Sequence, residues 1–209
     1  MINRRQFLGL SAGATALSLS GLSLTANATR VKTSARIVIL GAGAAGTAMA
    51  NRLSDNLEGA KIILIDGRKQ HYYQPGFTLI AAGLKPADYS VSDTKYWLPD
   101  GAELIQEAAA EIDPDGKSVT TASGTKVPYD YLVVATGLKL DWDSIEGFDL
   151  DMVGNNGLGA VYASPEHAAK TWQAMDKFTD TGGVGLFTRP ATEMKCAGQR
   201  HRHIRHASG

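Results

Sequence analysis

A glycine-rich stretch at residues 36–46 constrains the fold of this chain more than any other part of the sequence. It reads Arg-Ile-Val-Ile-Leu-Gly-Ala-Gly-Ala-Ala-Gly, a short apolar β run followed by a glycine turn. Small residues from Ala44 to about Leu57 then predict a helix, and a second apolar run, Lys61–Ile65, ends at Asp66. Strand, turn, helix, strand and carboxylate follow one another in the order of a βαβ unit that binds a dinucleotide.

Each glycine of this unit has an expected role. Gly41 permits the tight turn, Gly43 lets the backbone approach a pyrophosphate, and Gly46 lets the helix pack close to the strand. The pyrophosphate is expected at the helix N-terminus, and Asp66 is expected to accept hydrogen bonds from ribose hydroxyls. A glycine turn of an α/β protein that binds no nucleotide is the alternative. The cofactor-binding residues predicted from this unit are Gly41, Gly43, Ala44, Ala45, Gly46 and Asp66.

Charge and cysteine content limit the partners. The 209 residues balance 21 Lys+Arg against 21 Asp+Glu, but residues 1–28 and 199–209 carry arginines and no acid. The rest of the chain is therefore acidic, which argues against a nucleic-acid partner. A single cysteine, Cys196, excludes an internal disulfide. No Cys/His spacing in the body of the chain indicates a zinc site, so no metal is expected.

Residues 1–28 have the features of an export signal. Residues 3–8, Asn-Arg-Arg-Gln-Phe-Leu, resemble a twin-arginine signal, and a mildly apolar run leads to the small-residue cleavage pattern Ala-Asn-Ala at residues 26–28. We therefore expect cleavage after export to the periplasm; an uncleaved membrane anchor is the alternative. Because this route carries proteins already folded around their cofactors, it favours a tightly bound flavin over a diffusible nicotinamide.

The middle of the chain combines short helices with β structure. Phe77–Leu84 and Ser90–Leu98 are each expected to form a short helix. An Asp-Pro-Asp-Gly turn is expected at residues 113–116, between β segments. The expected strands are residues 103–107, 109–112, 117–121 and 129–135.

Beyond residue 137 the sequence predicts a loop, a helix and a strand. A Gly/Asn-rich run at residues 154–159 indicates a surface connection. The Ser-Pro-Glu sequence at residues 164–166 predicts the start of a helix that continues to about Phe178. Val184–Thr188 is expected to form a strand that begins a second domain, but no second Gly-x-Gly-x-x-Gly follows it.

Four short stretches together resemble one flavoprotein family. They are His-Tyr-Tyr-Gln-Pro at residues 71–75, Ala-Thr-Gly at 135–137, Ala-Lys-Thr-Trp at 169–172 and Lys-Cys-Ala-Gly at 195–198. In this combination the chain resembles the sulfide:quinone oxidoreductases, most closely the branch that includes the mitochondrial enzymes. The resemblance covers roughly residues 35–198.

The resemblance implies an α/β fold and FAD as the cofactor. A Rossmann-like FAD-binding domain, with a parallel sheet and an antiparallel β meander, is implied for residues 35–147. The beginning of a second nucleotide-binding-like α/β domain is implied for residues 160–198. The strand that ends at residue 137 is expected to return to the first sheet beneath the FAD. Further residues implied at the flavin are Gln74, Pro75, Ala135, Thr136 and Gly137; the alternative for the first two is that they only pack the loop.

The resemblance also implies the chemistry. Cys196 is the implied catalytic residue, which accepts sulfide sulfur as a persulfide before electrons pass through FAD to a quinone. A thiolate suits this role because it is soft and strongly nucleophilic. In the family a second cysteine and a membrane-touching C-terminus come later in the chain. Sulfide and a quinone are therefore the expected substrates, and membrane contact is expected only through parts outside these residues.

Residues 199–209 depart from the family pattern. They are rich in Arg and His with no apolar period, so we expect a disordered tail that follows a shifted reading frame or a truncated gene. Metal binding by His201, His203 and His206 is the alternative. Two other hypotheses for the whole chain stay open. One is a related flavin disulfide reductase or type-II NADH dehydrogenase, which the missing second glycine fingerprint disfavours. The other is a truncated, catalytically inactive fragment.

Overall fold

Four strands form a parallel sheet in the order β11–β2–β4–β7. Within this sheet Leu40 lies opposite both Ile65 and Val134, so the carboxyl ends of β2, β4 and β11 meet at one edge. The expected βαβ unit and the return of the later strand to the first sheet are both confirmed. The strand bounds are Tyr131–Val134 for β11, Arg36–Leu40 for β2, Lys61–Ile65 for β4 and Glu103–Ile105 for β7.

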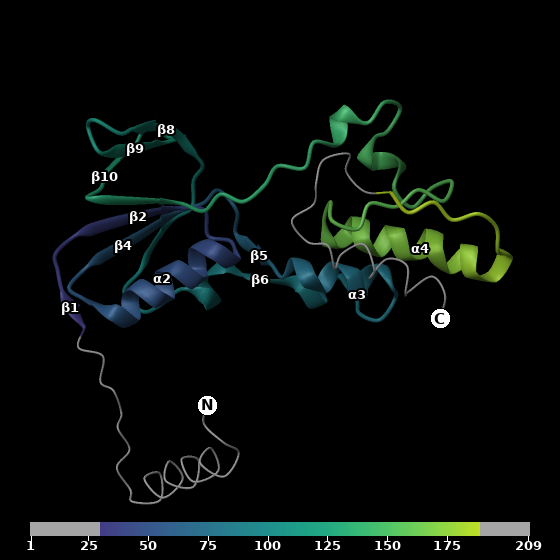
Figure 1. Cartoon of the computed structure of the whole chain (residues 1–209), viewed down its shortest axis with the longest axis horizontal. Helices are drawn as coiled ribbons and strands as arrows, with labels where there is room; N and C mark the ends of the chain where they lie inside the picture. Colours follow the sequence, from purple (N-terminus) through teal and green to yellow (C-terminus); the bar gives the residue numbers. More distant parts are fainter. Residues whose placement is uncertain (1–29, 189–209) are drawn as a thin grey trace, which may run out of the picture.

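Both faces of the parallel sheet are covered, as its apolar strands require (Figure 1). Ile37 and Ile39 of β2 pack with α2 (Ala44–Asn56) on one face. Val38 and Leu40 pack on the other face with an antiparallel sheet of order β10–β9–β8. This alternation explains why residues 37–40 of β2 are all apolar. The antiparallel strands are β8 (Ala109–Asp113), β9 (Ser118–Thr121) and β10 (Lys126–Pro128).

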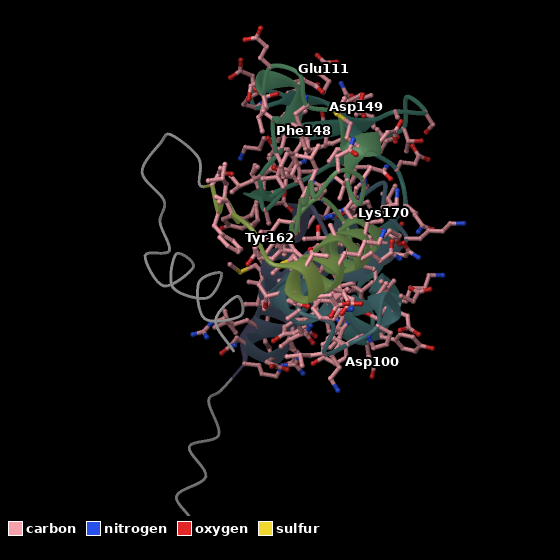
Figure 2. All side chains as sticks on the ribbon, turned by 90° about the vertical axis from the view of Figure 1, so that its right-hand side faces the viewer. Asp100, Glu111, Phe148, Asp149, Tyr162 and Lys170 are labelled. Carbon is pink, nitrogen blue, oxygen red and sulfur yellow. The ribbon has the colours of Figure 1, made fainter. Side chains whose placement is uncertain are left out.

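A second, helical lobe lies beside the sheet and is reached by an extended connection from β11 (Figure 1). It contains α3 (Phe77–Ala81) and α4 (Pro165–Thr181), which pack through a small buried cluster. Ser164 caps α4, since its Oγ accepts a hydrogen bond from the His167 N–H at 3.1 Å. The predicted helix is confirmed and extends three residues beyond Phe178. Figure 2 looks onto this lobe, with Lys170 on α4 and Tyr162 just before the helix in the chain.

Short strands and 3₁₀ turns complete the described part of the chain. The antiparallel pair β5 and β6 lies between the sheet and α3, and β1 pairs in parallel with β3. Their bounds are Val31–Lys32 for β1, Leu57–Glu58 for β3, Gln70–Tyr72 for β5 and Val91–Asp93 for β6. Single 3₁₀ turns lie at Gln74–Gly76, Ala87–Ser90, Thr94–Trp97, Trp142–Ser144 and Leu150–Met152.

Two secondary-structure predictions are wrong. Ser90–Leu98 is not one helix: β6 pairs with β5, and the Asp93 carboxylate then accepts a hydrogen bond from the Lys95 N–H, which starts a 3₁₀ turn. Val184–Thr188 is not a strand and is exposed to solvent. A strand needs a neighbour for its backbone hydrogen bonds, and none of the described residues pairs with this segment.

The structure is a computed structural model and describes residues 30–188. The export signal at residues 1–28, the Lys-Cys-Ala-Gly stretch at 195–198 with Cys196, and the tail at 199–209 lie outside the described residues. Within residues 30–188, no helix combines the length and the apolar character needed to cross a membrane.

Candidate nucleotide site

The glycine turn after β2 is held against the end of β11. Gly41 has φ +95°, and its N–H donates to the carbonyl of Ile65 at 2.8 Å. A Cβ at Gly41 would lie 2.5 Å from the carbonyl oxygen of Ala135 and 3.0 Å from the Cα of Thr136. Glycine is therefore required both by the backbone conformation and by the close approach of a second strand. This contact joins the first motif directly to the Ala-Thr-Gly segment.

The first turn of α2 is pressed onto the same glycine turn. A Cβ at Gly46 would lie 1.9 Å from the carbonyl oxygen of Gly41, which no side chain could tolerate. The hydroxyl of Thr47 is buried in the same turn and donates to the carbonyl of Gly43 at 2.9 Å. The helix α2 therefore begins directly at the turn, and its N-terminus lies at the edge of the sheet where the carboxyl ends of β2, β4 and β11 meet.

The space in front of this helix N-terminus is open. Among residues 30–188 no side chain caps α2, and the first turn of the helix holds no acid. Ala44 and Ala45 are exposed, and a Cβ at Gly43 would find only the Nη2 atom of Arg68 within 4 Å, at 3.7 Å. The first N–H groups of a helix lack partners within the helix and carry partial positive charge. The turn thus offers what a pyrophosphate needs, namely N–H donors and room for close approach.

Asp66 lies at the end of β4 and is tied to the turn. Its Oδ2 accepts the Ala42 N–H at 2.7 Å, and its Oδ1 accepts the Arg68 N–H at 2.9 Å. The guanidinium of Arg68 adds an ion pair at 3.2 Å. Burial alone would raise the pKa of Asp66, but hydrogen bonds from Arg68 and from Ala42 outweigh burial and hold the pKa below its ordinary value. The carboxylate is therefore ionised and fixed beside the glycine turn, where its oxygens already accept hydrogen bonds from Ala42 and Arg68.

Arg68 was not among the residues predicted from the sequence. Its side chain is 53% exposed and is bound only to Asp66 among the described residues. The signal that points to it is a basic residue two positions after the acid that ends β4, which is close enough for a local ion pair.

The polar-aromatic stretch at residues 71–75 begins at the turn and then leaves it. His71 is buried, its Nδ1 lies 3.5 Å from the carbonyl of Ala42, and its ring centroid lies 5.4 Å from that of Trp97. Gln74 and Pro75 are exposed in a 3₁₀ turn farther along the chain. Both interpretations of these two residues, flavin contact and loop packing, remain predictions.

The structure therefore gathers most of the predicted cofactor residues and leaves a few apart. Thr136 and Gly137 are exposed, and Gly137 has φ +78° with no described residue within 4 Å of a Cβ position. Cys196 lies outside the described residues, so its distance from the turn stays a prediction. The residues brought together at the sheet edge are Gly41, Gly43, Ala44, Ala45, Gly46, Asp66, Ala135 and Thr136.

One other cavity can be compared with this site. A shallow cavity of about 320 Å³ lies between α3 and α4, lined by Gly83, Lys85 and Trp172 among others, and none of the predicted cofactor residues lines it. Within residues 30–188, no group of three His, Cys, Asp or Glu side chains is placed to hold a metal ion.

Comparison with known proteins assigns the family. Residues 35–177 match the family described as "Pyridine nucleotide-disulphide oxidoreductase". The chain belongs to this family. It is 36% identical over 166 residues to the mitochondrial sulfide:quinone oxidoreductase of Mus musculus, covering 78% of this chain and 35% of that protein. It is 34% identical over 183 residues to the mitochondrial enzyme of Dictyostelium discoideum, covering 87% of this chain and 40% of that protein.

A solved structure agrees with these relatives. The sulfide:quinone oxidoreductase of Aquifex aeolicus aligns with a TM-score of 0.55 and 30% identity, over 71% of this chain and 33% of that one. The resemblance to sulfide:quinone oxidoreductases is thus confirmed. The chain spans 35–40% of the length of the two curated relatives named above.

Proposed function

We propose that this chain belongs to an FAD-dependent oxidoreductase of the sulfide:quinone oxidoreductase type. The observation that carries the proposal is the convergence of three strand ends, with a glycine turn and an ionised Asp66, at one edge of the sheet. Ligands of open α/β sheets bind at such edges. Because the chain spans only part of its relatives, the activity and the two substrates, sulfide and a quinone, are proposed for the whole protein.

The residues at this edge fit the adenosine diphosphate part of FAD. Gly43 offers an open backbone, the N-terminus of α2 offers N–H donors, and Asp66 offers acceptors for ribose hydroxyls. When bound, FAD supplies a two-electron acceptor that can receive electrons from sulfur and pass them to a quinone. The end of β11 at Ala135 and Thr136 packs against Gly41 and so lies where the cofactor would cross the sheet.

Cys196 is the proposed sulfur acceptor. Its thiol would take up sulfide sulfur and become a persulfide: one S–S bond would form, and one S–H bond of Cys196 and one of hydrogen sulfide would break. The electron pair and the two protons would pass to oxidised FAD, which would supply the oxidant when it is bound. These 209 residues contain one cysteine, so a second sulfur for repeated turnover is not available within them. For this polypeptide we therefore expect repeated sulfide turnover near zero. We also expect weak FAD binding, because the chain spans only 35–40% of the length of the two relatives named above.

The proposed setting is the periplasm, reached by twin-arginine export with removal of residues 1–28. Membrane contact would come from parts of the protein outside this chain. The FAD-binding unit is proposed to span residues 35–147, with a second, nucleotide-binding-like unit that begins at residue 160.

A single-turnover experiment tests the proposal. The purified 209-residue chain is incubated without oxygen with FAD and sodium sulfide, and Cys196 is then examined by mass spectrometry. We expect one sulfur atom to be added to Cys196 at the same rate as the absorbance of oxidised flavin is lost. In a Cys196→Ser variant we expect no added sulfur, and flavin reduction no faster than the reduction of free FAD by sulfide. Flavin reduction by NADH but not by sulfide would instead support a flavin disulfide reductase or NADH dehydrogenase. A chain that binds no FAD at all would favour the remaining hypothesis, a truncated and catalytically inactive fragment, over the proposal.

A further inference from the structure

We propose that Arg68 exchanges partners when a nucleotide binds, leaving the Asp66 carboxylate for the diphosphate and so vacating the positions that the ribose hydroxyls take. This inference rests on the proposed nucleotide site. It assigns a diphosphate-binding role to a residue that lies outside the glycine fingerprint.

The hydrogen bonds of Asp66 show why an exchange is needed. A carboxylate has about four positions at which it accepts hydrogen bonds, and all are used here. Two are taken by the backbone N–H groups of Ala42 and Arg68, at 2.7 and 2.9 Å. The other two are taken by Nε and Nη2 of the Arg68 side chain, at 3.3 and 3.2 Å. A ribose hydroxyl can therefore reach Asp66 only if the guanidinium gives up its place.

The two kinds of bond differ in how easily they are replaced. The backbone bonds belong to the glycine turn and to the end of β4, so they fix the carboxylate in position. The side-chain bonds are longer and come from a guanidinium that is 53% exposed and is bound to no other described residue. Departure of the guanidinium frees two acceptor positions, which matches the two hydroxyls of a ribose.

The guanidinium has a nearby destination. Its Nη2 lies 3.7 Å from the position of a Cβ at Gly43, so it borders the open space in front of the α2 N-terminus. A diphosphate placed there would lie between the helix N–H groups and Arg68. Arg binds phosphate through paired charge-assisted hydrogen bonds, as it binds a carboxylate, and a diphosphate offers the guanidinium more negative charge than the single carboxylate of Asp66 does. The exchange thus moves the guanidinium from the carboxylate to the diphosphate and leaves the carboxylate to the two backbone N–H groups and the ribose hydroxyls.

The test compares ligands with and without phosphate. Binding of FAD, ADP and adenosine to the purified 209-residue chain is measured by calorimetry and ligand-observed NMR, for the wild type and for Arg68→Ala, Arg68→Lys and Lys69→Ala. Lys69 is the matched control because it is the exposed, equally charged neighbour. Arg68→Ala is expected to weaken the binding of ADP and FAD by about tenfold. Adenosine should bind as well as before or better, since the Asp66 carboxylate is then open. Arg68→Lys is expected to recover part of the loss, and Lys69→Ala to change little.

Each other outcome overturns the exchange in a distinguishable way. If Arg68→Ala weakened the binding of ADP and adenosine equally, Arg68 would only position Asp66. If the variant bound both ligands more tightly, Arg68 would only block the site. Unchanged binding would remove any role for Arg68 while leaving the proposed function intact. A wild-type chain that binds neither FAD nor ADP would overturn the proposed function and this inference together.

Discussion

In both the sheet lobe and the helical lobe, segments far apart in the sequence are in contact. The two lobes differ in which atoms make the closest contacts. In the sheet lobe they are backbone contacts: Gly41 against the Ala135 carbonyl, and Gly46 against the Gly41 carbonyl. In the helical lobe they are side-chain contacts, such as the ring of Trp172 over Gly83. A single added methyl group should therefore damage the first lobe most, and a removed side chain the second.

The largest effect is expected from Gly46→Ala. A Cβ 1.9 Å from the Gly41 carbonyl must push α2 away from the turn, which we expect to lower the free energy of unfolding by about 3 kcal/mol or more and to abolish FAD binding. Urea denaturation and flavin fluorescence quenching measure the two effects. Gly43→Ala is the matched control, because it adds the same methyl group to open space: its stability should stay near wild type while FAD affinity falls. A Gly46→Ala protein with wild-type stability would contradict the backbone packing described here.

A smaller, local effect is expected from Trp172→Ala. The ring is half-buried between α4 and the turn at Gly83, so its removal should destabilise the helical lobe by about 2 kcal/mol. Hydrogen exchange read by mass spectrometry should become faster in α3 and α4 and stay unchanged in β2 and β4. Tyr96→Ala, which removes a largely exposed ring, should alter neither lobe. Equal acceleration in β2 and β4 would show that the two lobes unfold as one unit.

The smallest effect is expected at the opposite end of the sheet, where Asp130 pairs with Arg36 at 3.0 Å. The guanidinium and the backbone N–H of Arg36 lower the pKa of Asp130 to about 2, from an ordinary value of 3.8. Because the folded-state pKa is the lower one, the pair stabilises the protein above pH 3.8, and that contribution is lost as the pH falls towards 2. Thermal melts of wild type and Asp130→Asn should differ slightly at pH 5 and converge near pH 2. A difference that persists at pH 2 would assign the stabilisation to another cause.

The sequence predicted the sheet lobe well for a physical reason. Apolar runs, a glycine turn and a terminal acid are local signals, and in the order found at residues 36–66 they predict a βαβ unit whose two strands pair with each other. Ser90–Leu98 failed because β6 owes its strand conformation to β5, a partner on another segment. Val184–Thr188 failed because an apolar run of strand length has no strand conformation of its own without a neighbour to pair with.

In the candidate site, too, local patterns predict some residues, whereas others depend on contacts between distant segments. Gly41, Gly46 and Asp66 could be identified from spacing, since their roles follow from the turn that they form. The contact of Gly41 with Ala135 depends on strand order, and the link between Arg68 and the open space at Gly43 depends on side-chain placement. Neither is visible in a local pattern. Whether Cys196 reaches this edge is a prediction that the sulfur-transfer experiment tests.

The contact between Gly41 and Ala135 has a consequence for biosynthesis. The turn that opens early in the chain is completed by a carbonyl made much later, so a ribosome-bound chain cannot finish it until Ala135 has emerged from the exit tunnel. Any coenzyme that depends on this turn must therefore be captured late, after the polypeptide has looped back on itself, rather than while the first helix is being synthesised.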